Sequence, residues 1–373
     1  MIIGIDGNEA NIEKKVGIGE YAYELLVQFS KTASKRRDLI FRIYLKENPR
    51  NDLPPFSENW QYKVVGPKKL WTRIGLPFAL FISGEKPDVF FSPTHYGPRF
   101  SPVKTAMSIM DLSFIHFPEL FTKHDLFQLK NWTKVSAKNT KKIFTISNFS
   151  RDDIIKTYKA NPDKVVVTYL GIKSEFSKKV KYTNMEELKK KFGIKGNYIL
   201  FVGTLQPRKN IVRLIEAFSK VSDKNLQLVI VGKKGWQYDE ILSAPDKFNV
   251  SDRTKFLDFV TNEDLPSLYR NALCFVLPSL YEGFGLPVLE AMQYGCPVLA
   301  SNVSSLPEAG GDAAVYFNPN DANDIAKTIE KVIKDEKLRQ EMVKKGYNQI
   351  KKFSWEKTAQ KTLKVLEDLV NER

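Results

Sequence analysis

Apolar and polar residues follow one repeating order through the first half of the chain. Short runs rich in β-branched and aromatic residues alternate with longer stretches in which apolar residues recur at helical spacing. Strands that alternate with helices are typical of βαβ units and parallel sheets. We therefore predict a first doubly wound α/β domain, with strands at Ile2–Ile5, Leu39–Leu45, Asp88–Phe91, Thr105–Met110, Ile143–Ile146 and Val165–Tyr169.

The same order begins again after a Lys-rich, weakly apolar stretch from Ser177 to Lys195. We place the domain boundary in this stretch, so that the first domain spans residues 1–180 and the second spans residues 181–353. The second domain is also predicted to be a doubly wound, Rossmann-like α/β unit, and two such domains imply a cleft between them. Its predicted strands are Tyr198–Gly203, Leu226–Gly232, Lys255–Phe259, Cys274–Pro278, Pro297–Ala300 and Ala314–Phe317.

Beyond Asp321 the pattern is helical to the end of the chain, with breaks predicted at Gly346 and at Phe353-Ser354-Trp355. The longest uncharged apolar stretch, Ile74 to Gly84, is shorter than the roughly 18 residues that indicate a membrane-spanning helix. The chain starts directly with a predicted strand instead of a signal peptide. Cys274 and Cys296 each lie in an apolar run, which predicts buried, reduced thiols in a cytoplasmic protein.

Composition supports two globular domains, because 42% of the 373 residues are hydrophobic and 27% are charged. The formal net charge is +15 and is uneven: residues 1–180 hold 29 Lys and Arg against 18 Asp and Glu, whereas residues 181–373 hold 29 against 25. A basic field favours anionic partners. Nucleic acid, acidic lipid and a phosphorylated acceptor all satisfy this condition, and charge alone leaves the choice open.

The loops that follow the strands carry the candidate chemistry, because ligands of open α/β sheets bind at the carboxyl ends of the strands. The segment from Pro278 to Met292 follows a strand and opens a helix, with Pro287 suited to the first turn. Backbone N–H groups from Gly283 to Leu286 would point out of the helix N-terminus, where they favour a diphosphate. Glu282 in the loop and Glu290 on the helix would accept hydrogen bonds from hydroxyls on either side of the phosphates.

Two other loops suit an anionic ligand. After the first strand of the second domain comes Gly203-Thr204-Leu205-Gln206-Pro207-Arg208-Lys209-Asn210, in which Arg208 and Lys209 would neutralise a diphosphate. In the first domain, Gly17 and Gly19 form a Gly-x-Gly loop. This loop is not a dinucleotide fingerprint, because Ala22 stands where the third glycine belongs and Gly17 comes late after its strand. Each feature also has a structural interpretation, as a turn, a helix cap or a solvated basic pair.

Taken together, these segments resemble the retaining glycosyltransferases of the GT-B fold, family 4 (glycosyltransferase group 1, mannosyltransferase-like). Glu282 to Glu290, with its E-G-F-G-L-P core, is similar to the E-x7-E motif of that family, and Gly203 to Asn210 is similar to its G-x-L-x-x-R-K-N pattern. The resemblance covers the whole chain. It implies that residues 354–373 form a helix that crosses back to the first domain.

The resemblance also implies roles for the individual residues. Glu282 would contact the transferred sugar, and Glu290 would bind the ribose diol. The remaining donor-binding residues implied by the resemblance are Gly17, Gly19, Thr204, Arg208, Lys209, Val260, Gly283, Phe284, Gly285 and Leu286. Val260 belongs to a moderate match, Asp258-Phe259-Val260 followed by Asn262 to Leu265, for the segment that contacts the base.

The chain departs from the family pattern at one position. Met110-Asp111 stands where the family often has a His-Asp pair, so Asp111 and the later His116 are the candidate catalytic groups of this region. The chain contains no Asp-x-Asp, which leaves no evident ligands for a metal bridging the donor diphosphate. We expect no metal cofactor, with Arg208, Lys209 and the helix N-terminus supplying the positive charge.

The expected function is transfer of a hexose from GDP-mannose or a UDP-sugar to a glycan or lipid-linked acceptor, in polysaccharide synthesis. The alternatives are a glycoside hydrolase, which needs no phosphate cradle, and a basic nucleic-acid-binding protein, for which no motif is present. We also predict contact with an anionic membrane surface through a lysine stripe at Lys130, Lys134 and Lys138. Its apolar neighbours would be Phe114, Phe117, Phe121, Phe127 and Trp132.

Overall fold

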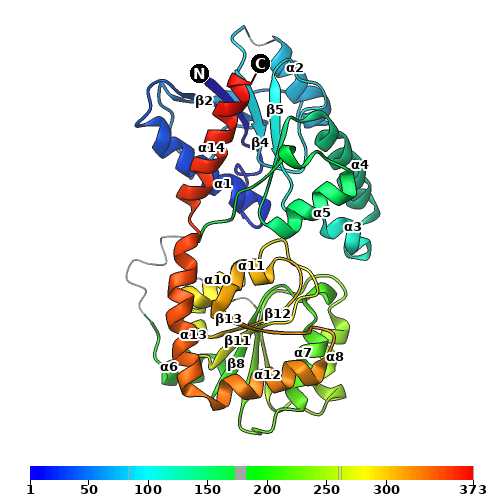
Figure 1. Ribbon diagram of the computed structural model, residues 1–373, viewed down its shortest axis with the longest axis vertical. Coiled ribbons are helices and arrows are strands. Elements are labelled where there is room, and N and C mark those ends of the chain that lie inside the picture. Colours follow the sequence, from blue (N-terminus) through cyan, green and yellow to red (C-terminus); the bar gives the residue numbers. More distant parts are fainter. Residues whose placement is uncertain (83, 173–181, 259, 262, 373) are drawn as a thin grey trace. The chain divides into compact units, whose positions relative to one another are not determined.

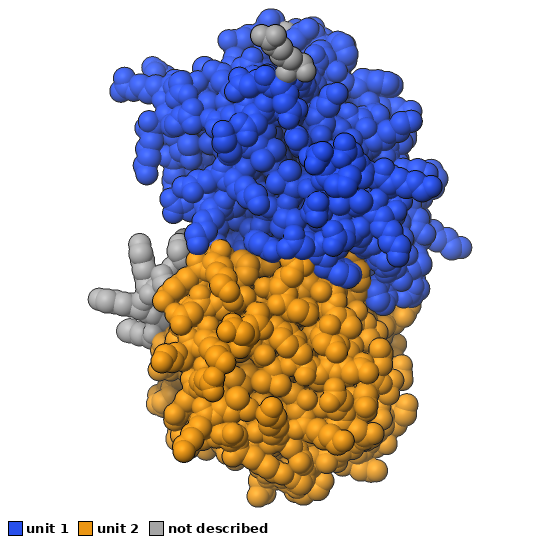
Figure 2. Space-filling model, viewed as in Figure 1, with its two compact units in different colours: residues 1–171, 354–373 blue, residues 172–353 orange. Residues whose placement is uncertain are grey.

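The computed structural model describes residues 1–82, 84–172, 182–258, 260–261 and 263–372. The chain forms two compact units (Figure 2): Met1–Gly171 with Ser354–Arg373, and Ile172–Phe353. The sequence placed the boundary after residue 180, whereas the first unit ends at Gly171. Of the Lys-rich stretch at this boundary, residues 177–181 lie outside the described residues.

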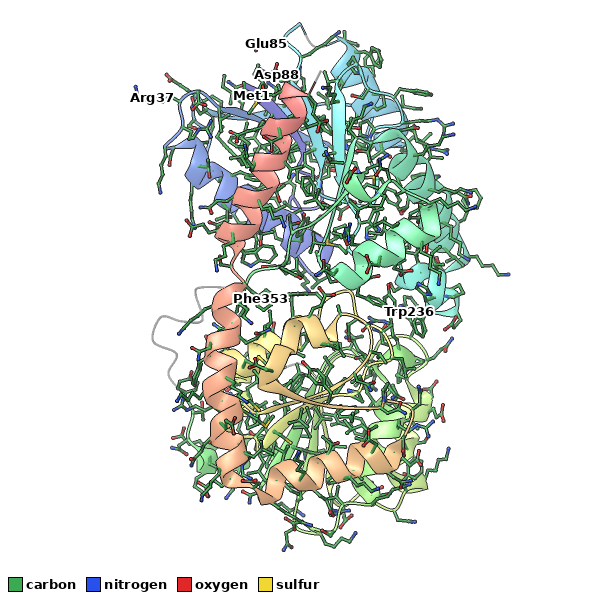
Figure 3. The ribbon with its side chains drawn as sticks, viewed as in Figure 1. Met1, Arg37, Glu85, Asp88, Trp236 and Phe353 are labelled. Atoms are coloured by element: carbon green, nitrogen blue, oxygen red, sulfur yellow. The ribbon has the colours of Figure 1, made fainter. Side chains whose placement is uncertain are left out.

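The first unit is built on a sheet of seven parallel strands in the order β3-β2-β1-β4-β5-β6-β7. Every neighbouring pair of strands is parallel, and the buried strands carry apolar side chains toward both faces. The amide of Ile2 donates to Asp88 Oδ2 at 2.7 Å, which joins the starts of β1 and β4 (Figure 3). The strands are β1 Ile2–Asp6, β2 Ile40–Leu45, β3 Trp60–Val64, β4 Val89–Ser92, β5 Lys104–Ser108, β6 Lys142–Thr145 and β7 Val165–Val167.

Helices cover both faces of this sheet (Figure 1). On one face, Phe29 of α1 stacks on Phe41 of β2, and α14 packs along α1. On the other face, α2 and the π-helical turn Trp71–Gly75 that precedes it pack over Tyr44 of β2. Positions 41 and 44 point to opposite faces because side chains alternate along a strand. The helices are α1 Ile18–Ala33, α2 Leu76–Ile82, α3 Ser113–His116, α4 Lys123–Asn139, α5 Asn148–Tyr158 and α14 Trp355–Asn371.

The second unit has a sheet of six parallel strands in the order β10-β9-β8-β11-β12-β13. The strands are β8 Tyr198–Val202, β9 Gln227–Val231, β10 Thr254–Leu257, β11 Cys274–Leu277, β12 Val298–Ser301 and β13 Ala314–Phe317. Helix α7 packs with α8 and α12, and α10 packs with α11 and α13. The helices are α6 Met185–Phe192, α7 Ile211–Ser219, α8 Asp239–Lys247, α9 Leu265–Asn271, α10 Leu286–Gln293, α11 Leu306–Gly310, α12 Ala322–Lys334 and α13 Glu336–Gln349.

The predicted doubly wound α/β fold is confirmed in both units. Strand β3, which the sequence analysis missed, is a polar edge strand without a clear apolar run. The predicted break at Gly346 is wrong, because α13 continues through this residue, which packs against Met292 of α10. The helices break instead at Asp335, whose side chain caps α13, and at the predicted Ser354, which caps α14.

Each sheet reverses its strand order at one place. The reversal lies between β1 and β4 in the first unit and between β8 and β11 in the second. At such a switch point the loops leaving the two central strands diverge to opposite faces of the sheet and leave room for a ligand. The loops that follow β8 and β11 contain the two motifs that the sequence analysis singled out.

Candidate active site

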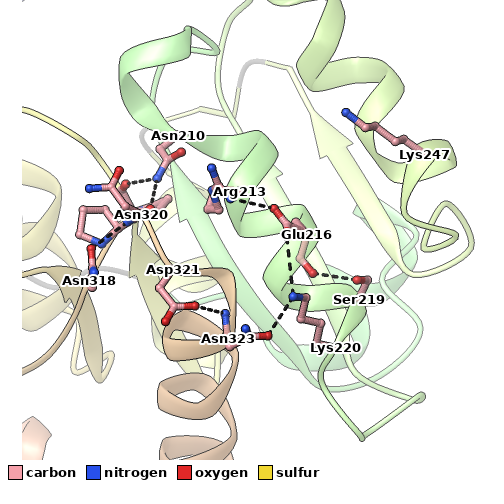
Figure 4. A network of polar contacts seen from close by, with 12 residues as sticks. Asn210, Arg213, Glu216, Ser219, Lys220, Lys247, Asn318, Asn320, Asp321 and Asn323 are labelled. Carbon is pink, nitrogen blue, oxygen red and sulfur yellow. Dashed lines mark hydrogen bonds and ion pairs between the residues drawn. The ribbon is translucent and has the colours of Figure 1, made fainter.

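The loops after β8 and β11 are joined directly by hydrogen bonds. The amide of Leu280 donates to the carbonyl of Arg208 at 2.9 Å. Asn210 adopts the left-handed conformation, with φ 58°, between the turn that carries Arg208 and the start of α7. Its side-chain amide donates to the carbonyls of Pro278 at 3.0 Å and Pro319 at 2.8 Å (Figure 4). The two motifs therefore form one structural element.

The carboxylate of Glu282 lies at the centre of this element. Its Oε1 accepts from Lys209 Nζ at 2.6 Å and from Ser279 Oγ at 2.6 Å, and its Oε2 accepts from Arg208 at 3.1 Å. Arg208 also donates to the carbonyl of Tyr281. Glu282 and Lys209 are buried, with exposed fractions of 7% and 8%. The structure thus brings three predicted site residues into a single ion-paired cluster.

Electrostatics keep the Glu282 carboxylate ionised. Burial by itself raises the pKa of a carboxyl group, but the charges of Lys209 and Arg208 outweigh it and lower the pKa of Glu282 to about 2. Hydrogen bonds from Lys209 and Ser279 act in the same direction. The two cations are held beside the N-terminus of α10, where an anionic ligand would meet their charge.

Helix α10 begins as the sequence predicted, with Pro287 in its first turn. Gly285 precedes the helix with φ 107°, a conformation that strains any residue with a side chain, and an added Cβ would also lie 2.8 Å from Leu306 Cδ2. Among the described residues, no side chain caps this N-terminus, and the amide of Val288 donates to the carbonyl of Gly285 at 2.9 Å. Gly283 and Phe284 are buried, and Leu286 is half-buried.

Two serines that the sequence analysis missed fix the backbone of Glu282. Its amide donates to Ser304 Oγ at 3.0 Å, and its carbonyl accepts from Ser305 Oγ at 2.8 Å. Both serines follow β12, so their place after a predicted strand was the available signal. Ser279, which donates to the Glu282 carboxylate, likewise follows a strand directly.

The remaining predicted residues of the second unit are Glu290, Thr204 and Val260. Glu290 Oε2 accepts from the hydroxyl of Tyr269 at 3.3 Å, and Tyr269 stacks on Tyr294. Thr204 is exposed at the end of β8, whereas Val260 is buried. Phe259 and Asn262, which belong to the predicted base-binding segment, lie outside the described residues.

The predicted glycine loop of the first unit lies at the N-terminus of α1. Gly17 has φ 54° and is exposed, with nothing within 4 Å of an added Cβ, so its conformation rather than its space favours glycine. Gly19 is buried, and an added Cβ would lie 2.9 Å from the carbonyl oxygen of Glu9. The loop therefore packs closely on the segment that follows β1.

Asp111 and His116 take part in separate hydrogen bonds. Asp111 Oδ1 accepts from the amide of Ser113 at 2.8 Å, at the start of α3. His116 Nε2 lies 2.8 Å from Asp153 Oδ2, which ties α3 to α5. The sequence analysis did not predict His95, which follows β4. Burial lowers the pKa of His95, and the charge of Asp111 opposes this shift. Within the part of the chain that is described, His95 Nδ1 has no hydrogen-bond partner.

A polar and aromatic cavity of about 230 Å³ lies at the switch point of the first sheet. We call it the Asp6 pocket and define it by Asp6, Asn8, Trp71, Tyr96 and Trp132. Asp6 is buried, and its carboxylate accepts from Trp71 Nε1 at 2.9 Å and from Asn8 Nδ2 at 2.6 Å. Burial raises the pKa of Asp6, although these hydrogen bonds oppose it. The sequence analysis missed this pocket because its residues come from four distant segments.

The predicted lysine stripe on α4 is exposed at Lys134 and Lys138, with Lys130 half-buried. Its predicted apolar contacts are wrong in part, because Phe114 is buried in the core and Phe121 packs against that core. Only Phe127 among the five aromatic residues is exposed. The spacing of these residues along the sequence could not show that α3 packs against α4 with Phe114 in the core.

Three further predictions concern the cysteines, a metal site and membrane spans. Cys274 and Cys296 are buried free thiols, as predicted. Among the described residues, no three His, Cys, Asp or Glu side chains gather as a metal site would require. No helix within the described ranges has both the length and the hydrophobicity to span a bilayer.

Comparison with known proteins identifies the family. The model of glycosyl transferases group 1 matches residues 184–349. O-antigen chain mannosyltransferase B of Escherichia coli is 34% identical over 278 residues, which cover 74% of this chain and 73% of that protein. The serotype-specific mannosyltransferase WbdA of Escherichia coli is 36% identical over 224 residues, which cover 58% of this chain but 27% of that longer protein.

Solved structures agree on the architecture. The structure of Anabaena Alr3699/HepE with UDP and glucose has a TM-score of 0.71 to this chain at 18% identity, covering 98% of this chain and 99% of that one. The fold is the GT-B fold of glycosyltransferases. The chain belongs to the glycosyl transferases group 1 family, so the predicted resemblance is confirmed. The alternatives of a glycoside hydrolase and a nucleic-acid-binding protein find no support.

Proposed function

We propose that this glycosyltransferase moves a mannosyl residue from a nucleoside diphosphate donor to a glycan or lipid-linked acceptor, with retention of anomeric configuration and without a metal ion. The observation that carries the proposal is the cluster of Glu282, Lys209 and Arg208 at the switch point of the second sheet. Two cations and the positive end of the α10 dipole would supply the positive charge that a departing diphosphate requires.

The donor would lie along the start of α10. Its distal phosphate accepts from backbone N–H groups of Gly283 to Leu286 and contacts Arg208 and Lys209. Glu290 binds the ribose diol, with its carboxylate oriented by the Tyr269 hydroxyl. Glu282 contacts the sugar, as the family resemblance implies, and its position next to both cations keeps it charged and fixed in place. Gly17 and Gly19 stay donor contacts that the family resemblance implies.

The chemical step breaks the bond between the anomeric carbon and the phosphate oxygen. An acceptor hydroxyl attacks the same face of the sugar, and its proton passes to the departing phosphate oxygen. The negative charge that develops on the diphosphate is balanced by Lys209 and Arg208. Glu282 already holds both cations in position, so their side chains need little reorganisation during the reaction. No enzyme nucleophile takes part in this scheme, and Asp111, His116 and His95 are candidates for contacts around the reacting sugar.

The relatives support the choice of sugar and pathway. Two of them are named mannosyltransferases, one of the O-antigen chain, which favours mannose and cell-surface polysaccharide synthesis. A UDP-sugar is the second candidate, because the structurally similar HepE binds UDP and glucose. We assign the acceptor sugar to the Asp6 pocket, whose aromatic rings and hydrogen-bonding groups suit a sugar ring and its hydroxyls. The protein would work at the cytoplasmic face of the membrane.

Titration calorimetry with GDP-mannose and UDP-glucose in EDTA tests this proposal. We expect saturable binding of one donor, with GDP-mannose preferred, and weaker binding by Lys209→Ala. An exposed lysine of α13, Lys344, provides the control variant Lys344→Ala, which should bind as the wild type does. Absence of binding to both donors, with and without Mg²⁺, would rule out the assigned donor site.

A further inference from the structure

The helical segment formed by the turn Trp71–Gly75 and α2 is apolar on both of its sides. Its inner side packs Trp71, Leu76 and Leu80 into the core of the first unit. Its outer side, on the outside of that unit in Figure 1, also carries large apolar residues. We call this outer side the α2 face and define it by Leu70, Ile74, Phe78, Phe81 and Ile82.

The α2 face is exposed to an unusual degree for such residues. Phe78, Phe81 and Ile82 have exposed fractions of 60%, 53% and 58%. Leu70, Ile74, Phe78 and Ile82 recur every four residues and Phe81 follows Phe78 by three, so the five residues lie on one side of the helical segment. A helix that covers a sheet in water normally presents polar residues on this side. A contiguous apolar stripe of this kind indicates a surface that another apolar phase covers.

A groove beside the stripe extends the apolar surface. It has a volume of about 330 Å³ and is lined mainly by backbone and apolar groups, including Val65, Phe78, Ala79 and Ile82. Among the described residues that line it, Lys63 is the charged one. The groove therefore combines a mainly apolar lining with a cationic group.

Basic residues lie close to the start of the α2 face and form what we call its rim. Lys69 precedes it, Arg73 lies within the turn and stacks on Trp132, and Arg99 is tied to the turn by a 2.8 Å hydrogen bond from its amide to the carbonyl of Thr72. The nearby acidic groups are engaged: Glu85 pairs with Arg42 and Glu47 pairs with Lys68. The rim of the face is therefore net positive.

We propose that the α2 face docks on an anionic lipid bilayer. Phe78, Phe81 and Ile82 enter the boundary between headgroups and acyl chains, and the basic rim contacts the headgroups. The charge pattern favours a bilayer over a second copy of the chain, because a symmetric dimer would bring two positive rims together. This inference rests on the proposed function, since a lipid-linked acceptor brings the enzyme to a bilayer. It moves the predicted membrane surface from α4 to α2.

Co-sedimentation of the full chain with lipid vesicles tests the proposal. The variant is Phe78→Gln with Phe81→Gln, and both side chains are exposed, so the core is left intact. Phe127→Gln on the α4 stripe and Phe56→Gln on another exposed loop are matched controls. With mixed phosphatidylglycerol and phosphatidylcholine vesicles we expect the double variant to bind at least about tenfold more weakly, and both controls to bind as the wild type does. Pure phosphatidylcholine and high salt should weaken wild-type binding.

Three results would overturn the proposal: no wild-type binding to either vesicle, wild-type affinity in the double variant, or a wild-type dimer in ultracentrifugation that the double variant dissociates. Calorimetry with GDP-mannose on the same samples, with circular dichroism as a check of folding, separates this inference from the proposed function. A double variant that still binds donor but not vesicles supports the α2 face. A wild type that binds vesicles but no nucleotide keeps the α2 face and contradicts the donor site.

Discussion

The two carboxylate oxygens of Glu282 accept from Lys209 and from Arg208. Glu290, on α10, accepts from the hydroxyl of Tyr269 on α9. The two carboxylates therefore lie in different surroundings. Glu282 is held among charges in the loop before α10, and Glu290 lies on the helix. Under the proposed function the two residues do different work. Substitutions of these residues should separate binding from turnover.

We expect Glu290→Ala to raise the donor KM, because the ribose loses an acceptor, with kcat changed less. Glu282→Ala should lower kcat by roughly a hundredfold, a typical cost for removing one preorganised transition-state contact. Steady-state kinetics of donor turnover provides both parameters. The exposed Glu336, on α13, gives a neutral control as Glu336→Ala. Wild-type kinetics in both site variants would mean that neither carboxylate contacts the donor.

The same carboxylate links stability to pH. Its folded-state pKa of about 2 lies below the ordinary value of 4.5, so its contribution is present above pH 4.5 and is lost as pH falls toward 2. The contribution is on the order of 3 kcal/mol. Denaturant unfolding of the wild type should show this fall, and Glu282→Gln should flatten it. Equal pH slopes in the two proteins would show that Glu282 is not held by its cations.

At the scale of elements, local sequence and tertiary packing disagree at Gly346. A glycine favours a helix break by propensity, yet α13 runs through it because the missing side chain lets α10 approach. An added Cβ would lie 3.1 Å from Met292 Cγ. The glycine therefore serves the contact between two helices.

Gly346→Val should destabilise the second unit by about 1 to 3 kcal/mol through overpacking. Met292→Ala in the same chain should recover part of this loss, because it vacates the space that the valine needs. Lys344→Val, on the exposed side of α13, controls for the lower helix propensity of valine. Urea unfolding of the wild type, the single variants Gly346→Val and Met292→Ala, and the double variant gives the interaction energy. A zero value would contradict the packing role of Gly346.

The patterns in the sequence were sufficient for the fold class and for the cluster of Glu282, Arg208 and Lys209, because strand ends and glycine positions are local signals. They could not reveal Ser304 or the Asp6 pocket, whose members meet only after the strands pair. The sequence analysis missed strand β3, because an edge strand needs few apolar residues. The sequence analysis also missed the exposed outer side of α2, because an apolar run does not reveal which of its residues face water.

At the scale of the whole molecule, the chain returns to its first unit at its end. Helix α14 packs along α1, and it buries Trp355, Leu363, Leu366 and Leu369. Residues more than 330 positions apart in the sequence also form an ion pair, between Arg36 and Glu367 at 2.8 Å. The first unit is therefore complete only when the last helix is present.

Leu366→Ala should lower the stability of the first unit by about 2 to 5 kcal/mol, because it opens a cavity between α14 and its neighbours. Hydrogen exchange measured by mass spectrometry should show faster exchange in α1 and β4, with β8 and β11 protected as in the wild type. Lys361→Ala, on the exposed side of α14, is the matched control. Uniform loss of protection across both units would contradict their separate cores.

The most direct test of the account is the anomeric configuration of the product formed in EDTA. Purified enzyme, GDP-mannose and a mannose-terminated acceptor are incubated without divalent metal, and the new linkage is read by NMR. The account predicts an α-linked mannose, since the donor is α-linked and the reaction retains configuration with Lys209 and Arg208 neutralising the diphosphate. A β-linked product, or transfer that occurs only after Mg²⁺ or Mn²⁺ is added, would contradict it.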